Sequence, residues 1–147
     1  MHYYLNIGTN LGDRRQNLRR AIAMLSAGNG GCMVSHVVES EPWGFESANA
    51  FLNVGVAIST TLPPLEVLQW LHDIERRMGS GSHRNADGTY ADRLVDIDIM
   101  AIDNDNGEPV SIQLPMLQVP HRHLYDREFF LKPYRELNDA VRFRAGK

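Results

Sequence analysis

Two hydrophobic periods follow one another along the chain, a period of two that is typical of strands and a period near 3.6 that is typical of helices. Residues 3–7 are expected to form a first strand that Gly8 closes, and the turn-rich stretch T-N-L-G-D follows. Asp13 and Gln16 resemble a capping box that opens a helix. The apolar stripe of that helix comprises Leu18, Ala21, Ile22 and Leu25, and residues 28–31 end it.

The middle of the chain predicts two more strands and a second helix. Residues 33–40 form the second expected strand, and residues 51–60 form the third, in which Leu52, Val54, Val56 and Ile58 share one face. Pro63 and Pro64 open the helix, because proline is tolerated in a first helical turn. Its apolar stripe comprises Val67, Leu71, Ile74 and Met78.

A long polar stretch, residues 79–92, separates this helix from a fourth strand over residues 93–100. Unpatterned segments of that length in a compact domain are usually functional or mobile. The run D-N-D-N-G then predicts a turn, residues 110–114 a further strand, and L-Y-D-R-E-F-F-L-K-P a short last helix.

The element order is therefore β-α-β-β-α-β-β-α, which places the chain in the α+β class with a mainly antiparallel sheet and helices packed on it. A ferredoxin-like β-α-β-β-α-β core with an added hairpin is the expected arrangement, although the pattern alone does not separate it from other antiparallel sheets. The length of 147 residues suits a single domain over residues 1–147.

Composition narrows the function without naming it. The net charge of −3 and the pI near 6.0 argue against a general nucleic-acid-binding protein. Cys32 is the single cysteine, so the chain has no disulfide framework and suits a reducing compartment. The sequence has no signal-peptide pattern and no apolar run near the ~20 residues that a membrane helix needs, so a cytoplasmic location is expected.

Candidate chemistry centres on R-L-V-D-I-D-I-M, in which Asp96 and Asp98 interrupt an apolar strand. Simple alternation explains them as the polar face of a half-buried strand. Alternatively, carboxylates at this spacing, about 6.5–7 Å along a strand, can converge on metal ions. The spacing permits both interpretations, because D-x-D on a strand is common.

Other polar motifs are weaker. The run from Asp103 to Gly107 lacks the spacing and terminal glutamate of an EF-hand. His121-x-His123 lacks a third ligand, Glu75 has the pattern of a solvated helix acid, and the arginines at 14, 15, 19 and 20 are expected on the solvated side of the first helix. A phosphate loop of the G-x-x-x-x-G-K-[ST] type is absent, so any nucleotide is held by other means.

Four separated motifs in fixed order change this picture. They are I-G-T-N-L-G-D, then E-P-W-G-F with F-L-N-V-G-V, then R-L-V-D-I-D-I-M, and last V-P-H-R-H-L-Y-D-R-E-F-F-L-K-P. Over residues 3–133 the chain resembles the 6-hydroxymethyl-7,8-dihydropterin pyrophosphokinases of folate biosynthesis. The resemblance implies a small α+β fold and an enzyme that passes pyrophosphate from ATP to the pterin hydroxymethyl group, releasing AMP.

The resemblance also implies roles for single residues. Asp96 and Asp98 would bind two Mg²⁺ ions that bridge the ATP phosphates, with Arg93 beside the triphosphate and Glu75, His121 and Arg127 contacting ATP. Phe51 and Phe129 would sandwich the pterin ring, and Asn53 and Ser40 would bond its polar edge. Gly8 and Asn10 match the signature near the pterin. The partners implied are small molecules, with no nucleic acid, membrane or obligate protein partner.

One stretch departs from the family pattern. Serines stand at Ser80 and Ser82, where many members carry arginines on a loop that closes over ATP, and Tyr90 stands where a tryptophan is frequent. Arg84 is the candidate substitute for the missing cations and, with Asp96, Asp98 and Arg93, a candidate catalytic residue. A slower enzyme, or a loop that recruits Arg84, is the resulting hypothesis.

Two other functions stay open from the residues alone. Another magnesium-dependent phosphotransferase or phosphodiesterase could use the D-I-D strand without a pterin. A non-catalytic small-molecule-binding module of the α+β class would not need Asp96 or Asp98. Calorimetry with an ATP analogue, magnesium and the pterin separates the three.

Overall fold

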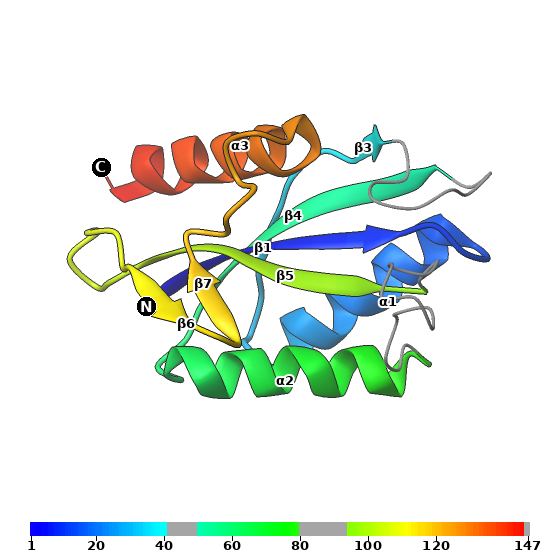
Figure 1. The fold of residues 1–147 in the computed structure, drawn as a ribbon, viewed down its shortest axis with the longest axis horizontal. Helices are drawn as coiled ribbons and strands as arrows, with labels where there is room; N and C mark the ends of the chain where they lie inside the picture. Colours follow the sequence, from blue (N-terminus) through cyan, green and yellow to red (C-terminus); the bar gives the residue numbers. More distant parts are fainter. Residues whose placement is uncertain (41–49, 80–93, 146–147) are drawn as a thin grey trace.

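An antiparallel sheet with helices on both faces makes up the molecule (Figure 1). The computed structural model describes residues 1–40, 50–79 and 94–145. The described elements, in chain order, are β1 (His2–Thr9), α1 (Arg14–Ala27), β2 (Met33–Val34), β3 (Val38–Ser40), β4 (Phe51–Ser59), α2 (Pro64–Arg77), β5 (Asp96–Asp103), β6 (Ile112–Leu114), β7 (Leu117–Val119) and α3 (Glu128–Ala145).

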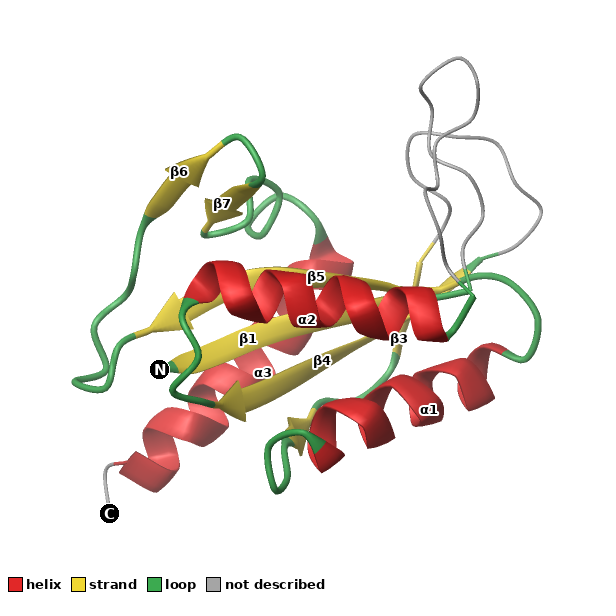
Figure 2. Ribbon diagram, turned by 90° about the horizontal axis from the view of Figure 1, so that it is seen from below, coloured by secondary structure: helices red, strands yellow, loops and turns green. Residues whose placement is uncertain are grey.

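The main sheet has the strand order β2-β4-β1-β5. β3 also pairs with β4, closer to the beginning of β4 than β2 does. Every pairing is antiparallel, and β1 in the centre runs beside β4 on one side and β5 on the other. α1 and α2 cover one face and α3 the other, as Figure 2 shows. The predicted α+β class with its mainly antiparallel sheet is confirmed.

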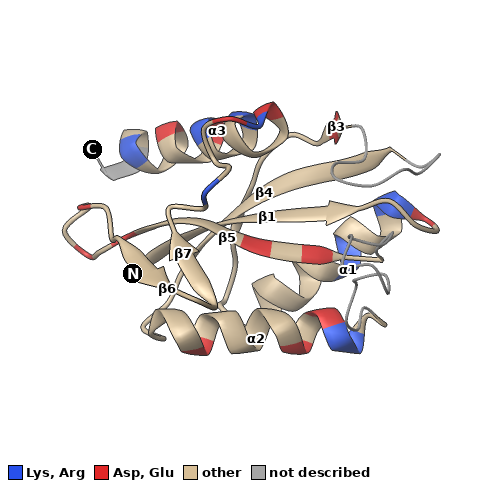
Figure 3. Cartoon of the chain, in the orientation of Figure 1, with Lys and Arg blue, Asp and Glu red and all other residues tan. Residues whose placement is uncertain are grey.

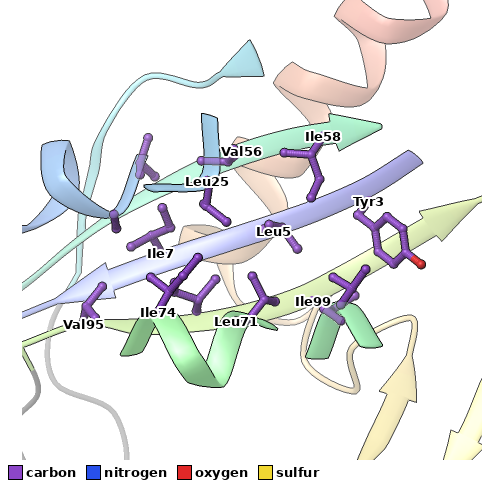
Figure 4. Packing of buried hydrophobic residues seen from close by; sticks show 14 of the residues in the cluster. Tyr3, Leu5, Ile7, Leu25, Val56, Ile58, Leu71, Ile74, Val95 and Ile99 are labelled. Atoms are coloured by element: carbon purple, nitrogen blue, oxygen red, sulfur yellow. The ribbon is translucent and has the colours of Figure 1, made fainter. Parts of the chain in front are cut away.

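The face beneath α1 and α2 holds the larger core. Alternate residues of three strands point into it, and the predicted apolar stripes of both helices meet them. Figure 4 shows Leu5 and Ile7 of β1 beside Leu71 and Ile74 of α2. Burying an aliphatic side chain of this size contributes about 1.5–3 kcal/mol, so this layer is the principal source of stability.

The face beneath α3 is divided. At one end Tyr4, Ala57 and Ala101 pack against Leu124, Phe130 and Leu137, which makes a smaller apolar cluster. Toward the other end the same strands present polar side chains and a glycine on this face: Asn6, Gly8, Asn53, Asp96 and Asp98. The sheet therefore changes from apolar to polar along its own length on one face only.

A β-bulge in β5 shifts the alternation of its side chains between the polar and the apolar end of the strand. Tyr4 pairs with Ala101 and Leu5 pairs with Ile99, so Met100 is an extra residue. Bulges insert one unpaired residue and locally change the strand's alternation. As a result Ile97, Ile99 and Ile102 all reach the large core, although strict alternation would separate Ile102 from the other two.

Two predicted strands end differently from the expectation. β1 continues through Gly8, which pairs with Asn53 on one side and Asp96 on the other. The second strand is broken into β2 and β3 next to Ser35. There the Ser35 hydroxyl accepts the Gly55 N–H at 2.8 Å in place of a backbone carbonyl, while the Ser35 N–H still donates to the Gly55 carbonyl at 2.9 Å.

The C-terminal third also differs. β7 was not predicted, and it pairs with β6 in a separate two-stranded sheet. The last helix was expected to be short and to end with Pro133, but α3 continues through Pro133 for 18 residues in all. Leu131 and Leu137 of this helix are buried, so packing against the sheet carries the helix past the proline.

Local signals at the helix starts are confirmed. Asp13 is the N-cap of α1 and accepts a hydrogen bond from the Gln16 N–H at 3.1 Å. α2 begins at the second of the two prolines. Among the described residues, no helix is both long and apolar enough to cross a membrane.

Candidate active site

A row of side chains crosses the polar end of the sheet. In register, Val38 of β3 lies opposite Asn53 of β4, Asn53 opposite Gly8 of β1, and Gly8 opposite Asp96 of β5. In Figure 3 red acidic positions mark the half of β5 that is remote from the β6–β7 hairpin, whereas Asp103 ends the strand on the other side. Residues opposite one another on neighbouring strands share a face and lie close together.

Asp96 and Asp98 are half-buried, and the residues that alternate with them, Val95, Ile97 and Ile99, are buried. The strand thus fixes both carboxylates on the α3 face while its other face is held in the core. Their oxygens are the hard ligands that Mg²⁺ prefers, and Mg²⁺ commonly takes one or two carboxylates together with phosphate oxygens and water. The pair fits that metal, although within the described residues no three His, Cys, Asp or Glu side chains gather into a metal site.

Asn53 and Ser40 form the opposite end of the row. The Asn53 amide nitrogen donates to the Ser40 hydroxyl at 2.7 Å and to the Val38 carbonyl at 3.3 Å, and Asn53 is 3% exposed. These bonds orient the carboxamide. Both amide hydrogens are used in these two bonds, so the Asn53 Oδ1 is the atom left to accept from a donor on the edge of a heterocycle.

Gly8 lies opposite this amide and close to the aromatic ring of Phe51. A Cβ at Gly8 would lie 3.2 Å from Asn53 Oδ1 and 3.5 Å from Phe51 Cδ1. The absence of a side chain therefore allows Asn53 and the half-buried Phe51 to approach the central strand. Asn10, just beyond β1, is 1% exposed, and the following turn is held by Asn17, whose amide donates to the Leu11 carbonyl at 2.8 Å.

The start of α3 brings a second aromatic group to this face. Phe129 and Phe130 lie edge to face with ring centroids 4.7 Å apart. His121 contacts Phe130 in the same manner at 5.1 Å, and the Arg127 guanidinium lies 5.8 Å from the Phe130 centroid. Phe130 is thus the buried support on which three predicted site residues, Phe129, His121 and Arg127, converge.

His121 is fixed by its backbone and its ring. Its N–H donates to the Met100 carbonyl at 2.8 Å, and its Nδ1 accepts from the His123 N–H at 3.1 Å. Burial lowers the pKa of His121 to about 4, with a further contribution from the positive charges of neighbouring groups, His123 first. The imidazole is therefore neutral at pH 7.

Glu75 has a definite structural partner. Its Oε2 accepts the Ile97 N–H at 2.9 Å, so the helix α2 reaches the outer edge of β5 between Asp96 and Asp98. The expectation of a merely solvated helix acid is wrong. A carboxylate on a backbone donor of the acid-bearing strand stabilises that strand's position.

Comparison with known proteins decides the family. Residues 4–139 match the family model described as 7,8-dihydro-6-hydroxymethylpterin-pyrophosphokinase. The chain belongs to this family. It is accordingly an ATP-dependent pyrophosphokinase of folate biosynthesis, as the resemblance of its four motifs had implied.

Individual relatives agree with the family. The chain is 39% identical over 131 residues to the 2-amino-4-hydroxy-6-hydroxymethyldihydropteridine pyrophosphokinase of Porphyromonas gingivalis, covering 88% of this chain and 86% of that protein. It is 35% identical over 140 residues to the Bacillus subtilis protein of the same name, covering 94% and 78%. A Lactococcus lactis relative, named as the bifunctional protein FolKE, is 33% identical, and the match covers 92% of this chain and 37% of that protein.

The structure brings most of the predicted pyrophosphokinase site residues to one end of the sheet. The sheet register unites Ser40, Phe51, Asn53, Gly8, Asp96 and Asp98. The first turn of α3 adds Phe129, and the segment before α3 adds Arg127 and His121. Arg84 and Arg93 lie outside the described residues. The binding and catalytic roles of all these residues remain predictions.

Two residues at this end were not recognised in the sequence. Asn6, 2% exposed, lies opposite Asp98 and donates to the Phe129 carbonyl at 3.2 Å. Arg14, expected on the solvated side of α1, is instead half-buried and donates to the Ala50 carbonyl at 2.8 Å, directly before Phe51. A polar residue inside the apolar run Y-Y-L-N-I was the signal for Asn6.

Proposed function

We propose that the polar end of the sheet is the active site at which the protein transfers pyrophosphate from ATP to 6-hydroxymethyl-7,8-dihydropterin. The products are the pterin diphosphate and AMP. The observation that carries the proposal is the register that aligns Asn53, Gly8 and Asp96 across three strands. A pterin that contacts Asn53 of β4 would then be separated from Asp96 of β5 only by the central strand β1.

The pterin is expected at the Asn53 end of the row. A flat bicyclic ring suits two aromatic side chains, here Phe51 and Phe129, because offset stacking adds about 0.5–1.5 kcal/mol beyond burial. The oriented carboxamide of Asn53 and the Ser40 hydroxyl supply partners for the ring's polar edge. A site built to bond a polar edge discriminates strongly against analogues that lack it.

Asp96 and Asp98 are the residues that would hold magnesium. The bound metal supplies charge neutralisation on the phosphate oxygens during the transfer. The expected number of two ions remains a prediction that rests on the resemblance. The fixed strand positions of the carboxylates, with Ile97 and Ile99 anchored in the core, support a pre-organised site.

The nucleotide is expected beside β5 and the start of α3. His121 and Arg127 are the described groups proposed to contact ATP, with Glu75 at the strand edge. Because Nδ1 accepts the His123 N–H, the neutral His121 ring carries its proton on Nε2 and can donate a hydrogen bond from there without adding charge. Arg93 and Arg84 are proposed to complete the neutralisation of the triphosphate.

Transfer of this kind demands positioning more than covalent chemistry. The pterin hydroxymethyl oxygen attacks the β-phosphorus of ATP in line, the bond from that phosphorus to the α-phosphate oxygen breaks, and AMP leaves with that oxygen. No protein residue is assigned as a general base. The protein's proposed contribution is to hold the two substrates in line and to neutralise the phosphate charge.

The test is AMP formation by the purified protein with ATP, magnesium and the pterin. AMP and pterin diphosphate are expected in equal amounts, and neither without the pterin or with excess EDTA. ATP hydrolysis without the pterin would favour the phosphodiesterase-type alternative. Pterin binding by calorimetry without any AMP formation would favour the non-catalytic binding module.

Asn53→Ala is the variant that tests the substrate assignment within the same assay. It removes the carboxamide that Ser40 and Val38 orient. The KM for the pterin is expected to rise about five- to 150-fold while the KM for ATP stays within about twofold, because an unmatched polar edge costs about 1–3 kcal/mol. The cytoplasmic location expected from the sequence stays a prediction.

A further inference from the structure

Asn6 is a buried amide in the central strand, between the two halves of the proposed site. It lies opposite Asp98 of β5 and opposite Gly55 of β4, and it is 2% exposed. Its amide nitrogen donates to the backbone carbonyl of Phe129, 123 positions away in the sequence, at 3.2 Å. Buried amides are costly unless bonded, so this bond has a structural or functional reason.

The Phe129 carbonyl needs an outside donor because of the sequence of α3. In an α-helix the carbonyl of residue i accepts from the N–H of residue i+4. The residue four positions after Phe129 is Pro133, which has no N–H. Asn6 therefore supplies the hydrogen bond that the proline removes from the first turn of α3.

The proline itself is fitted to the same place. A Cβ built at Gly55 would lie only 2.9 Å from Pro133 Cβ, so the proline packs directly on the glycine backbone. Gly55 lies opposite Asn6 in the sheet. The close contact sets the distance between helix and sheet, and the amide sets the orientation of the first helical turn.

We propose that Asn6 is a positioning residue for the aromatic clamp: by replacing the donor missing at Pro133, it fixes Phe129 beside the strand that carries Asp98. The proposal rests on the proposed function, in which Phe129 stacks on the pterin. Asn6 itself need not touch the substrate. Its loss is expected to loosen the first turn of α3 and leave the Asp96–Asp98 strand intact.

The first test is Asn6→Ala with binding measured by calorimetry. The pterin dissociation constant, with magnesium and a non-hydrolysable ATP analogue present, is expected to rise about three- to tenfold, the usual effect of one hydrogen bond. The dissociation constant of the ATP analogue alone is expected to stay within about twofold. Unchanged pterin affinity in a folded Asn6→Ala variant would overturn the proposal.

Pro133→Ala is the decisive second variant. It restores the N–H that can bond the Phe129 carbonyl, and it keeps the Cβ that contacts Gly55. The Asn6→Ala substitution is therefore expected to change pterin affinity by less than about twofold in the Pro133→Ala background. A defect of equal size in both backgrounds would show that Asn6 acts otherwise, for example by filling space. If Asn6→Ala alone does not fold, this comparison within the Pro133→Ala background decides.

Asn138→Ala is the matched control. Asn138 is another asparagine that joins α3 to β1, donating to the Tyr4 hydroxyl at 3.2 Å, but it lies two turns further along the helix. It is expected to leave the pterin dissociation constant within about twofold of the wild type. An increase equal to that of Asn6→Ala would mean that general docking of α3, not the positioning of Phe129, is at work.

Hydrogen exchange separates this inference from the function on which it rests. The amides of Phe130 and Leu131, which bond the Arg127 carbonyl, lie in the first turn of α3. Faster exchange there in Asn6→Ala, reversed by Pro133→Ala, supports the positioning role even if the wild-type protein binds no pterin. Unchanged exchange overturns it even if the enzyme assay succeeds.

Discussion

The two faces of the sheet are built from the same strands but differ in composition: one is apolar throughout, and the other is apolar at one end and polar at the other. Beneath α1 and α2, residues such as Leu5, Val54 and Ile97 make one continuous apolar layer. Beneath α3, the apolar cluster around Tyr4 and Leu137 occupies only one end, and amides and carboxylates occupy the other.

The difference shows how a small domain holds polar groups in fixed places. Asn6, Asn53, Asp96 and Asp98 at the polar end each have neighbours on both sides in the chain that are buried in the opposite layer. The α1–α2 layer thus fixes the backbone from which the polar side chains project, so a site of half-buried carboxylates needs little packing of its own. Stability and chemistry are expected to respond to substitutions on opposite faces.

The largest expected effect is on chemistry at the polar end. Asp98→Asn keeps the shape of the side chain but removes its charge, and it is expected to lower kcat/KM by about a thousandfold or more, roughly 4 kcal/mol. The measure is AMP formation at saturating magnesium. Asp103→Asn, at the other end of β5, is the matched control and is expected to stay within about threefold. A loss below tenfold for Asp98→Asn would contradict the metal assignment.

The next effect is on stability and concerns the apolar layer. Leu71→Ala leaves a cavity at a fully buried position and is expected to cost about 2–5 kcal/mol of unfolding free energy in urea denaturation. Leu65→Ala, at a position 49% exposed on the same helix, is expected to cost less than about 0.5 kcal/mol. Equal costs would mean that the α2 face is not the stabilising layer described here.

Two glycines sharpen the comparison within the α3 face. Gly55→Ala places a Cβ 2.9 Å from Pro133 Cβ and Leu137 Cδ1, and is expected to cost about 1–3 kcal/mol of stability through overpacking. Gly8→Ala meets only Asn53 and Phe51, at 3.2 Å or more, and is expected to cost less than about 1 kcal/mol of stability while weakening pterin binding. Thermal melts and pterin calorimetry on both variants check this. The reverse order of stability losses would contradict it.

The smallest effect is a dependence of stability on pH. The pKa of His121 is lowered to about 4 in the fold, against about 6.5 in an unfolded chain. Between these values the unfolded chain binds more protons, so the unfolding free energy rises with pH from 4 to 6.5 and is lost again as pH falls. Because the side chain is partly exposed, about 1 kcal/mol is expected from this group.

His121→Gln checks this contribution. Its unfolding free energy is expected to change less between pH 7 and pH 4.5 than that of the wild type, measured by urea denaturation at each pH. His72→Gln, which removes an exposed histidine on α2, is the matched control for the substitution itself. Identical pH profiles for His121→Gln and the wild type would contradict the prediction.

The apolar layer was predictable from the sequence because its signals are local and periodic. Leu52, Val54, Val56 and Ile58 alternate as a strand must, and they are buried together. The end of the last helix and the break in the second strand were predicted wrongly, because residues distant in sequence override the local rule there. Pro133 predicts the end of a helix, but Asn6 and Gly55, both remote in sequence, allow the helix to continue. Ser35 interrupts a strand whose residues alternate well, because its own hydroxyl bonds the N–H of the distant Gly55.

The candidate site was predictable only in part, for the same reason. The spacing of Asp96 and Asp98 suggested a metal site without deciding it, and the four motifs in order supplied the rest. The hydrogen bond between Asn53 and Ser40 depends on the pairing of β3 with β4, which no local pattern encodes. Arg14 looked like one of several surface arginines, and only the fold brings it to the Ala50 carbonyl.

Met100, the extra residue of the bulge, allows the length of β5 to change at one point without a change in which face its residues occupy. Without Met100, Ile99 would still face Leu5 and the two acids would keep their side of the sheet, because Met100 has no partner of its own on β1. A chain that lacks Met100 would retain the orientation of both carboxylates. Deletion of Ile97, which lies between the two acids, would instead turn one carboxylate toward the apolar layer. Tolerance to a change in length is thus confined to one position of this strand, just outside the part that carries the acids.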